Sequence, residues 1–166
     1  MNRVQLAIER IQFVRQYTLT LLTDLKPEDW FRMPAEGVTH IAWQVGHIAI
    51  AEYAMTMRYI RGRQPGDEDF IPREFVSLFG KGSVVDSDAA RHPSPDEIRK
   101  ALDRIHERVP IELANLSDAE LDQPPTSPHP AFSTKLAALF FCGEHEMVHA
   151  GQIGLVRRLL GYAPVR

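Results

Sequence analysis

The chain has 166 residues, of which 44% are hydrophobic and 25% charged, and its formal net charge is -3. This composition is ordinary for a globular domain and provides enough apolar residues for a full core. The slightly acidic balance excludes a typical nucleic-acid binder, the single cysteine excludes an internal disulfide framework, and no apolar run is long enough to span a bilayer. The charged N-terminus is unlike a signal peptide. We therefore expect one cytoplasmic domain over residues 1–166, with neither nucleic acid nor membrane as a partner.

Apolar residues at helical spacing predict two long helices in the first part of the chain. The first covers about residues 2–25, with an apolar stripe of Val4, Ile8, Ile11, Val14 (or Phe13), Leu21 and Leu25. The second starts at Thr39, the expected N-cap residue, and continues to about Arg61, where Gly62 and Pro65 stop it.

Two further helices are predicted in the second part. Ser94, Pro95 and Glu97 form the pattern of a capping box, which begins a helix that runs to about Leu116. The last helix begins near Ser133 or Thr134 and ends before Gly161. Because no segment alternates in the manner of a strand, the prediction is an all-α fold, a four-helix bundle.

The connection between the second and third predicted helices, about residues 62–93, is long. It is rich in Pro, Gly, Asp and Ser and contains one short apolar piece at residues 75–79. Connections of this length are usually functional or mobile. Such a connection also permits the second and third helices to run parallel.

Two histidines stand four residues apart in the last predicted helix, in the sequence His145-Glu146-Met147-Val148-His149. On a helix they share one face, with Cβ atoms about 6 Å apart, so both imidazoles can reach one metal ion. The pattern matches the H-E-x-x-H signature of zinc proteases. No His, Asp, Glu or Cys follows His149, however, so the downstream third ligand of those proteases is missing. A third protein ligand must come from upstream.

His47 is the best upstream candidate for a third ligand. It lies in the middle of the second predicted helix among small and apolar neighbours, where a buried imidazole needs a partner. His40 lies seven residues earlier, at the helix start, and is expected to contact loop or solvent. His92 and His129 lie in Pro-rich loops, where we expect solvent-exposed side chains, and His106 lies in a charged stretch that indicates an exposed helix face.

Other residues of the last helix share the face of His145 and His149. Cys142 is a possible fourth ligand or reactive thiol, although a small core residue is the simpler interpretation. Gln152 is a candidate for orienting an imidazole or a bound water, and Glu146 for a catalytic base. Both have alternatives, a polar helix end for Gln152 and a solvent-facing or ion-paired side chain for Glu146. Gly151 and Gly154 weaken a helix, so we expect them at a close helix contact or at a dimer contact.

Two motifs together resemble a known family. Residues 41–48, with the sequence IAWQVGHI, resemble the helix-two motif of the DinB/YfiT-like superfamily. Residues 145–152, HEMVHAGQ, resemble its helix-four motif, His-x-x-x-His-x-Gly-Gln. The resemblance implies a four-helix bundle with a divalent metal on His47, His145 and His149, and often a homodimer. Characterised relatives include S-transferases and isomerases that use thiols such as bacillithiol and mycothiol. Ala150 replaces an arginine that many members carry, so a different substrate is expected if that arginine binds a substrate anion.

Three imidazoles would leave open positions on a metal ion, for which zinc is the first expectation and nickel, iron or manganese are alternatives. The leading hypothesis is a metal-dependent S-transferase, in which the metal activates a low-molecular-weight thiol that attacks a small electrophilic substrate. A metal-dependent hydrolase that uses metal-bound water, with Glu146 or Gln152 assisting, is an alternative. A non-catalytic metal- or ligand-binding stress protein is a third.

Overall fold

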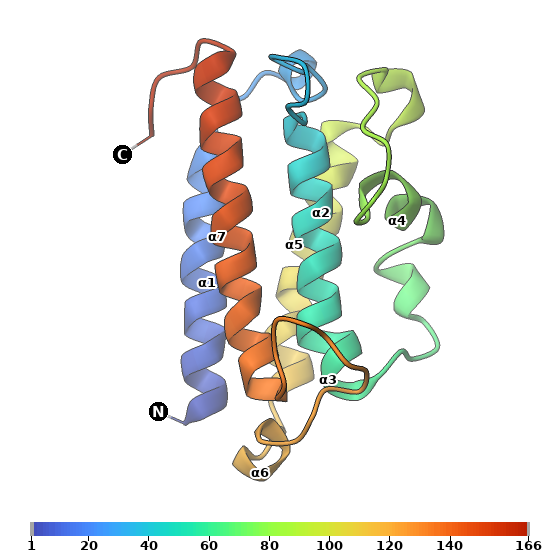
Figure 1. Cartoon of the computed structure of the whole chain (residues 1–166), viewed down its shortest axis with the longest axis vertical. Coiled ribbons are helices and arrows are strands. Elements are labelled where there is room, and N and C mark those ends of the chain that lie inside the picture. Colours follow the sequence, from blue (N-terminus) through green and yellow to red (C-terminus); the bar gives the residue numbers. More distant parts are fainter. Residues whose placement is uncertain (1, 166) are drawn as a thin grey trace.

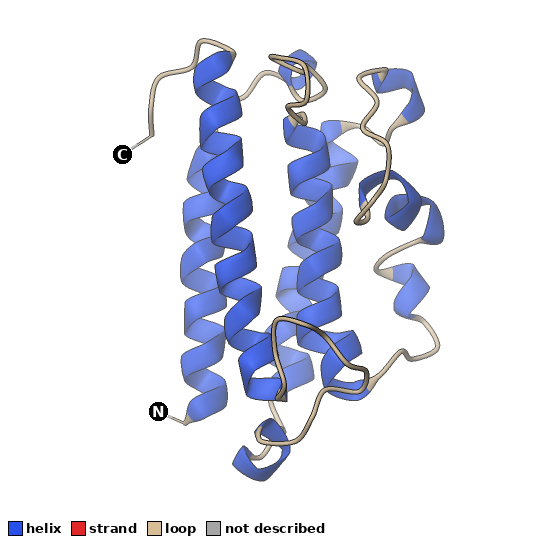
Figure 2. Cartoon of the chain, in the orientation of Figure 1, coloured by secondary structure: helices blue, strands red, loops and turns tan. Residues whose placement is uncertain are grey.

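The computed structural model describes residues 2–165, and every regular element in that range is helical (Figure 2). Four long helices form the bundle: α1 (Arg3–Leu22), α2 (Ile41–Tyr53), α5 (Pro95–Leu113) and α7 (Lys135–Leu159). In Figure 1, α1 and α7 run upward side by side, whereas α2 and α5 both run downward. The predicted all-α four-helix bundle is confirmed.

The second predicted helix is built from three pieces that follow one another without a break. After α2 come a π-helical turn, Ala54–Arg58, and the short α3, Tyr59–Arg61. The helix ends at Gly62, whose φ of +80° suits glycine, so the predicted end is confirmed. Its start is not at Thr39. The N-cap is His40, whose Nδ1 accepts a hydrogen bond from the backbone N–H of Trp43. An imidazole nitrogen can replace the usual hydroxyl oxygen there.

The remaining helix starts follow the local signals, but two helix ends differ, the first being that of α1, which ends at Leu22, three residues before the predicted end. Ser94 and Glu97 form the predicted capping box of α5, and Thr134 is the N-cap of α7. The helix α5 ends at Leu113, three residues before the predicted end, because a second capping box at Ser117 begins the short α6 (Asp118–Leu121). A capping box stabilises a new helix start and so fixes where the chain turns.

The connection over residues 62–93 runs back along the outside of the bundle beside α2, which explains why α2 and α5 are parallel (Figure 1). Its apolar piece forms α4 (Arg73–Phe79), which packs against α2. Gly46 permits this contact, because a Cβ atom added there would overlap the ring of Phe79, which is fully buried. Gly151 and Gly154, for which a close helix contact was one expectation, have no such contact within the chain. A Cβ atom added at Gly151 would meet nothing within 4 Å, and one at Gly154 would meet only Leu21 at 3.9 Å.

Replacing Gly46 with alanine should therefore lower the free energy of unfolding by about 1–3 kcal/mol, the usual cost of overpacking. Gly151→Ala is the matched control in another helix, and we expect it to be neutral or to stabilise by up to about 1 kcal/mol, since alanine favours helix. Urea denaturation of the two variants measures both effects. Equal stabilities for the two variants would contradict the assigned role of Gly46.

A buried charged cluster joins all four long helices. Arg15 of α1 donates from Nε to Glu146 of α7 at 2.8 Å and from Nη2 to Glu52 of α2 at 2.7 Å. The second oxygen of Glu52 lies 2.7 Å from Nδ1 of His106 in α5. The side chains of Arg15, Glu52 and Glu146 are 3% exposed or less. His106 was predicted to be exposed, and this is wrong, because its imidazole turns inward to pair with Glu52.

Candidate metal centre

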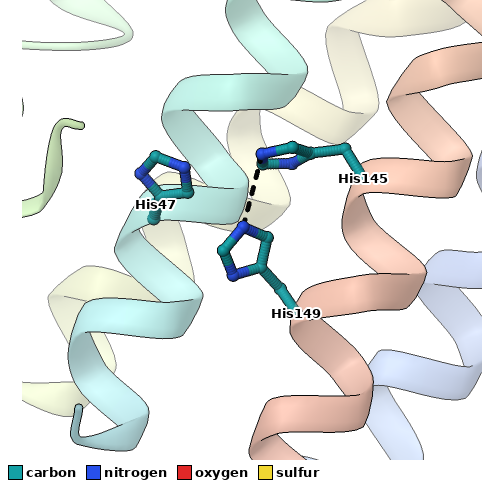
Figure 3. A group of neighbouring side chains, drawn as sticks. All are labelled: His47, His145 and His149. Atoms are coloured by element: carbon teal, nitrogen blue, oxygen red, sulfur yellow. Dashed lines mark hydrogen bonds between the residues drawn. The ribbon is translucent and has the colours of Figure 1, made fainter. Parts of the chain in front are cut away.

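Three histidines from two helices meet in one cluster. His47 extends from α2, and His145 and His149 extend from successive turns of α7; the three rings point toward one another (Figure 3). One ligand nitrogen from each lies within 4.8 Å of the others. The Nε2 atoms of His145 and His149 are 3.3 Å apart. Two ligands at 2.0–2.1 Å from a tetrahedral ion are about 3.3–3.4 Å apart, so His145 and His149 have the spacing that a metal ion of zinc's size requires, and His47 lies close enough to be a third ligand.

Hydrogen bonds outside the cluster orient two of the imidazoles. Nδ1 of His47 donates to the carbonyl oxygen of Phe79 at 2.9 Å, and Nδ1 of His149 donates to Oε1 of Gln44 at 2.5 Å. Gln44 is held in turn by Thr39, whose hydroxyl oxygen accepts from its amide group. A proton on Nδ1 leaves the lone pair on Nε2, which is the arrangement that a metal requires. Both rings are therefore set for binding through Nε2.

Trp43 fixes the ring plane of His47. The two rings stack with centroids 4.7 Å apart and planes 7° from parallel, and Trp43 Nε1 donates to Ser83 Oγ at 2.8 Å. Trp43 is half-buried beside the cluster, where it limits the freedom of His47.

Burial keeps the three imidazoles neutral. Together with the neighbouring His47, it lowers the pKa of His145 to about 4. Burial and the adjacent His145 lower the pKa of His149 to about 3, and burial also lowers the pKa of His47. Neutral imidazole is the form that ligates, so protons compete little for these nitrogens at neutral pH.

The same pKa shifts predict how the stability of the metal-free protein depends on pH. Histidine has a pKa near 6.5 when unfolded, so between pH 6.5 and about 4 the unfolded chain binds more protons than the folded chain. The contribution of these histidines to stability should therefore fall as the pH drops through this window, and it should be constant below about pH 3. Urea denaturation in chelator across pH 7 to 4 measures the slope. The double variant His145→Asn/His149→Asn should have a shallower slope, and an equal slope would contradict the assignment.

The two predicted catalytic residues lie in different surroundings from each other. Both carboxylate oxygens of Glu146 accept hydrogen bonds from Arg15 in the buried charged cluster, an arrangement that does not favour a base at the histidines. Gln152 is exposed on α7, one turn beyond His149.

Cys142 is buried, and burial, followed by the charges of Glu52 and Glu146, raises the pKa of its thiol well above the usual value. It is outside the histidine cluster, as the simpler interpretation predicted.

The other histidines take no part in the cluster. His40 is fully buried and contacts a loop, as expected, but not solvent: its Nε2 donates to the carbonyl oxygen of Asp86 at 2.9 Å. His92 packs near Phe31, with centroids 5.1 Å apart. His129 stacks on Phe132 with centroids 4.1 Å apart, so neither loop histidine is simply surrounded by solvent.

The sequence did not reveal the residues that orient the three histidines. Gln44 lies in the helix-two motif, but nothing in its position shows that it faces His149, which is 105 residues away. The Phe79 carbonyl has no signal in the sequence, because the path of the connection decides where it lies. One clue was present, since ligating histidines usually bond to a second group through the other ring nitrogen.

The fold and the cluster define an all-helical bundle protein with a three-histidine site between its second and last long helices. The family model of the DinB superfamily matches residues 10–153, and the chain belongs to this superfamily. The match includes all three histidines and confirms the family that the two motifs resemble.

A solved structure has the same fold. The crystal structure of a conserved protein from Enterococcus faecalis is similar with a TM-score of 0.73 and 15% sequence identity, over 96% of this chain and 97% of that chain. At this identity the likeness concerns the fold alone. A comparison with curated proteins gives no match. None of the helices in residues 2–165 has the length and apolar character needed to cross a membrane.

Proposed function

We propose that the protein is a cytoplasmic metal-dependent enzyme that transfers a low-molecular-weight thiol to a small electrophilic molecule. The observation that carries this proposal is the donor set. Within the described residues, the cluster contains three imidazoles and neither a carboxylate nor a thiol. Such a set leaves open positions on a divalent ion, for which zinc is our first choice. An ion there lowers the pKa of a thiol that binds it.

The chain's own residues would support this reaction by positioning. His47, His145 and His149 present their nitrogens from two helices, and Trp43 and Phe141 supply apolar surface beside them. In the transfer, the thiol loses its proton to water, its sulfur forms a bond to the electrophilic carbon, and the bond from that carbon to the leaving group breaks. This step needs no carboxylate base from the protein.

The contacts of Glu146 favour thiol transfer over hydrolysis. A hydrolase of this kind needs a group that accepts a proton from water, and the carboxylate proposed for that task is bound to Arg15 at 2.8 Å and 3.1 Å. Gln152 is free to contact a substrate, because its side chain is exposed one turn beyond His149. We therefore propose Gln152 as a contact for the bound small molecule.

An assay with a thiol panel tests the proposal. Metal-loaded protein is mixed with monochlorobimane and, in turn, with glutathione, cysteine, bacillithiol or mycothiol, and chloride release and thioether formation are followed. We expect turnover with at least one thiol, and loss of that turnover in His149→Ala. Turnover of ester or amide substrates without any thiol would favour the hydrolase. Metal-dependent stabilisation with no turnover would favour a binding protein.

We also propose that the protein forms a homodimer through the outer face of α1 and α7. Apolar side chains are exposed on both helices, among them Phe13 at 61%, Tyr17 at 38% and Val148 at 65%. A surface groove brings Tyr17 of α1 next to Gly151 and Gly154 of α7, so the exposed apolar side chains of the two helices lie on one face. Apolar patches of this kind mark interaction surfaces.

Phe13→Asp should therefore convert the dimer to a monomer without unfolding it. Light scattering after size exclusion measures the mass, and circular dichroism checks the fold. Val84→Asp is the matched control, because Val84 is exposed at 88% on the connection, away from this face. A monomeric mass for the unmodified protein at micromolar concentration would contradict the dimer.

A further inference from the structure

A small cavity lies between the second long helix and the connection that runs beside it. Its volume is about 130 Å³. One wall is apolar and consists of Ile50 and Ala54 from the helix and Ile71 and Val76 from the connection. A cavity of about 150 Å³ with apolar walls can bind benzene, so this one can hold a ring or a chain of five or six carbon atoms.

The polar side of the cavity is cationic. Arg58 and Arg63 line it together with Asp67 and with Tyr53, whose hydroxyl donates to Asp67 at 2.8 Å. The charge of Asp67 is already matched, since its carboxylate accepts two hydrogen bonds from Arg61, at 2.8 Å and 3.2 Å. Arg63 pairs with Glu68 at 3.1 Å. Arg58 is exposed, no salt bridge among residues 2–165 includes it, and its guanidinium lies 5.1 Å from the ring centroid of Tyr59. The cavity therefore offers one unmatched positive charge.

The helix departs from regular α geometry where it forms this wall. The π-helical turn comprises Ala54–Arg58, so both Ala54 and Arg58 belong to it. An inserted π turn changes the direction of the side chains that follow it, and such turns are frequent at functional sites. Here the turn places an arginine at the end of an apolar wall.

The cavity also adjoins the histidine cluster. Ile50 follows His47 by three residues on one face of α2, which is about 4.5 Å along the axis. On the other side, α4 contributes Val76 to the cavity and the Phe79 carbonyl to His47. Both sites therefore use residues of α2 and α4, although His145 and His149 extend from α7.

We propose that this cavity binds the apolar part of a small carboxylic acid, with the carboxylate held by Arg58. Its role as the substrate pocket rests on the function proposed above, whereas the binding itself does not. The ligand's apolar group is no larger than a benzene ring, and its negative charge lies at the end of the cavity away from His47.

Binding is tested with benzoate and with benzamide, its neutral counterpart, on metal-free protein. Titrations followed by methyl NMR should show shifts at Ile50, Ala54, Ile71 and Val76, with benzoate binding about tenfold more tightly than benzamide. A hydrogen bond to a charged group accounts for a difference of that size. Arg58→Gln should remove the preference, and Ala54→Leu should weaken both ligands by filling the cavity. Phenyl phosphate in a parallel titration distinguishes a carboxylate site from a general anion site.

Arg10→Gln is the matched control, because Arg10 also lies over an aromatic ring, that of Phe13 at 5.5 Å, but on the opposite helix α1. It should keep the preference for benzoate. Equal binding of benzoate and benzamide, shifts outside the four methyl-bearing residues, or tighter binding of phenyl phosphate would overturn the proposal. Because no metal or turnover is involved, failure here leaves the thiol-transfer proposal standing, and failure of that assay leaves this one.

Discussion

Replacing Arg15 with methionine should lower the free energy of unfolding by about 3–5 kcal/mol, the largest stability effect expected for a single substitution in this protein. Arg15 is 1% exposed and donates to two carboxylates that are buried with it. Without its charge, Glu52 and Glu146 would face each other in the core with His106 as the remaining partner. Breaking a buried ion pair on one side leaves an uncompensated charge, which costs more than the pair contributes. Urea denaturation at neutral pH measures the loss.

Arg3→Met provides the control on the same helix. Arg3 pairs with Asp122 at 2.6 Å, but the two side chains are 38% and 64% exposed, so water replaces the interaction. We expect little change in this variant. The triple variant Arg15→Met/Glu52→Gln/Glu146→Gln should recover part of the lost stability, because it removes the unmatched charges as well. An Arg15→Met protein as stable as Arg3→Met would refute the role given to the buried cluster.

His149→Ala should reduce the metal content from about one equivalent to background. The variant removes one of three ligands, whereas Gln44→Ala removes only the acceptor that orients His149. Loss of such an orienting group costs about 10–100-fold in metal affinity, so the loss of His149 itself should cost more than about 100-fold. Competition with a chromogenic chelator measures both affinities. His92→Ala is the control, since His92 lies outside the cluster, and it should bind as the unmodified protein does. Unchanged affinity in His149→Ala would place the metal elsewhere.

Local signals predicted much of the fold. Ser94 with Glu97 marked the start of α5, and Gly62 marked the end of the second long helix, because caps and turns depend on residues close in the chain. The cluster of three histidines also follows from the sequence, as His145 and His149 share a helix face and His47 lies in a recognisable motif; that they bind a metal stays a prediction.

Contacts between distant residues could not be predicted in the same way. Whether His106 faces solvent depends on Glu52 and Arg15, which lie on two other helices. In a charged stretch of sequence, a histidine that pairs with a buried residue has the same kind of sequence neighbours as a histidine that faces solvent. The π-helical turn and the path of the connection depend likewise on packing, so the cavity that they form was not foreseen.

We propose that His47, His145 and His149 bind one metal ion together. An anomalous difference map tests this binding. The crystal is grown from protein purified without chelator, and data are measured on both sides of the absorption edge of the metal found in it. We expect a single peak bounded by Nε2 of all three histidines. A peak at other residues, or no peak between these imidazoles after soaking with zinc and nickel, would contradict it.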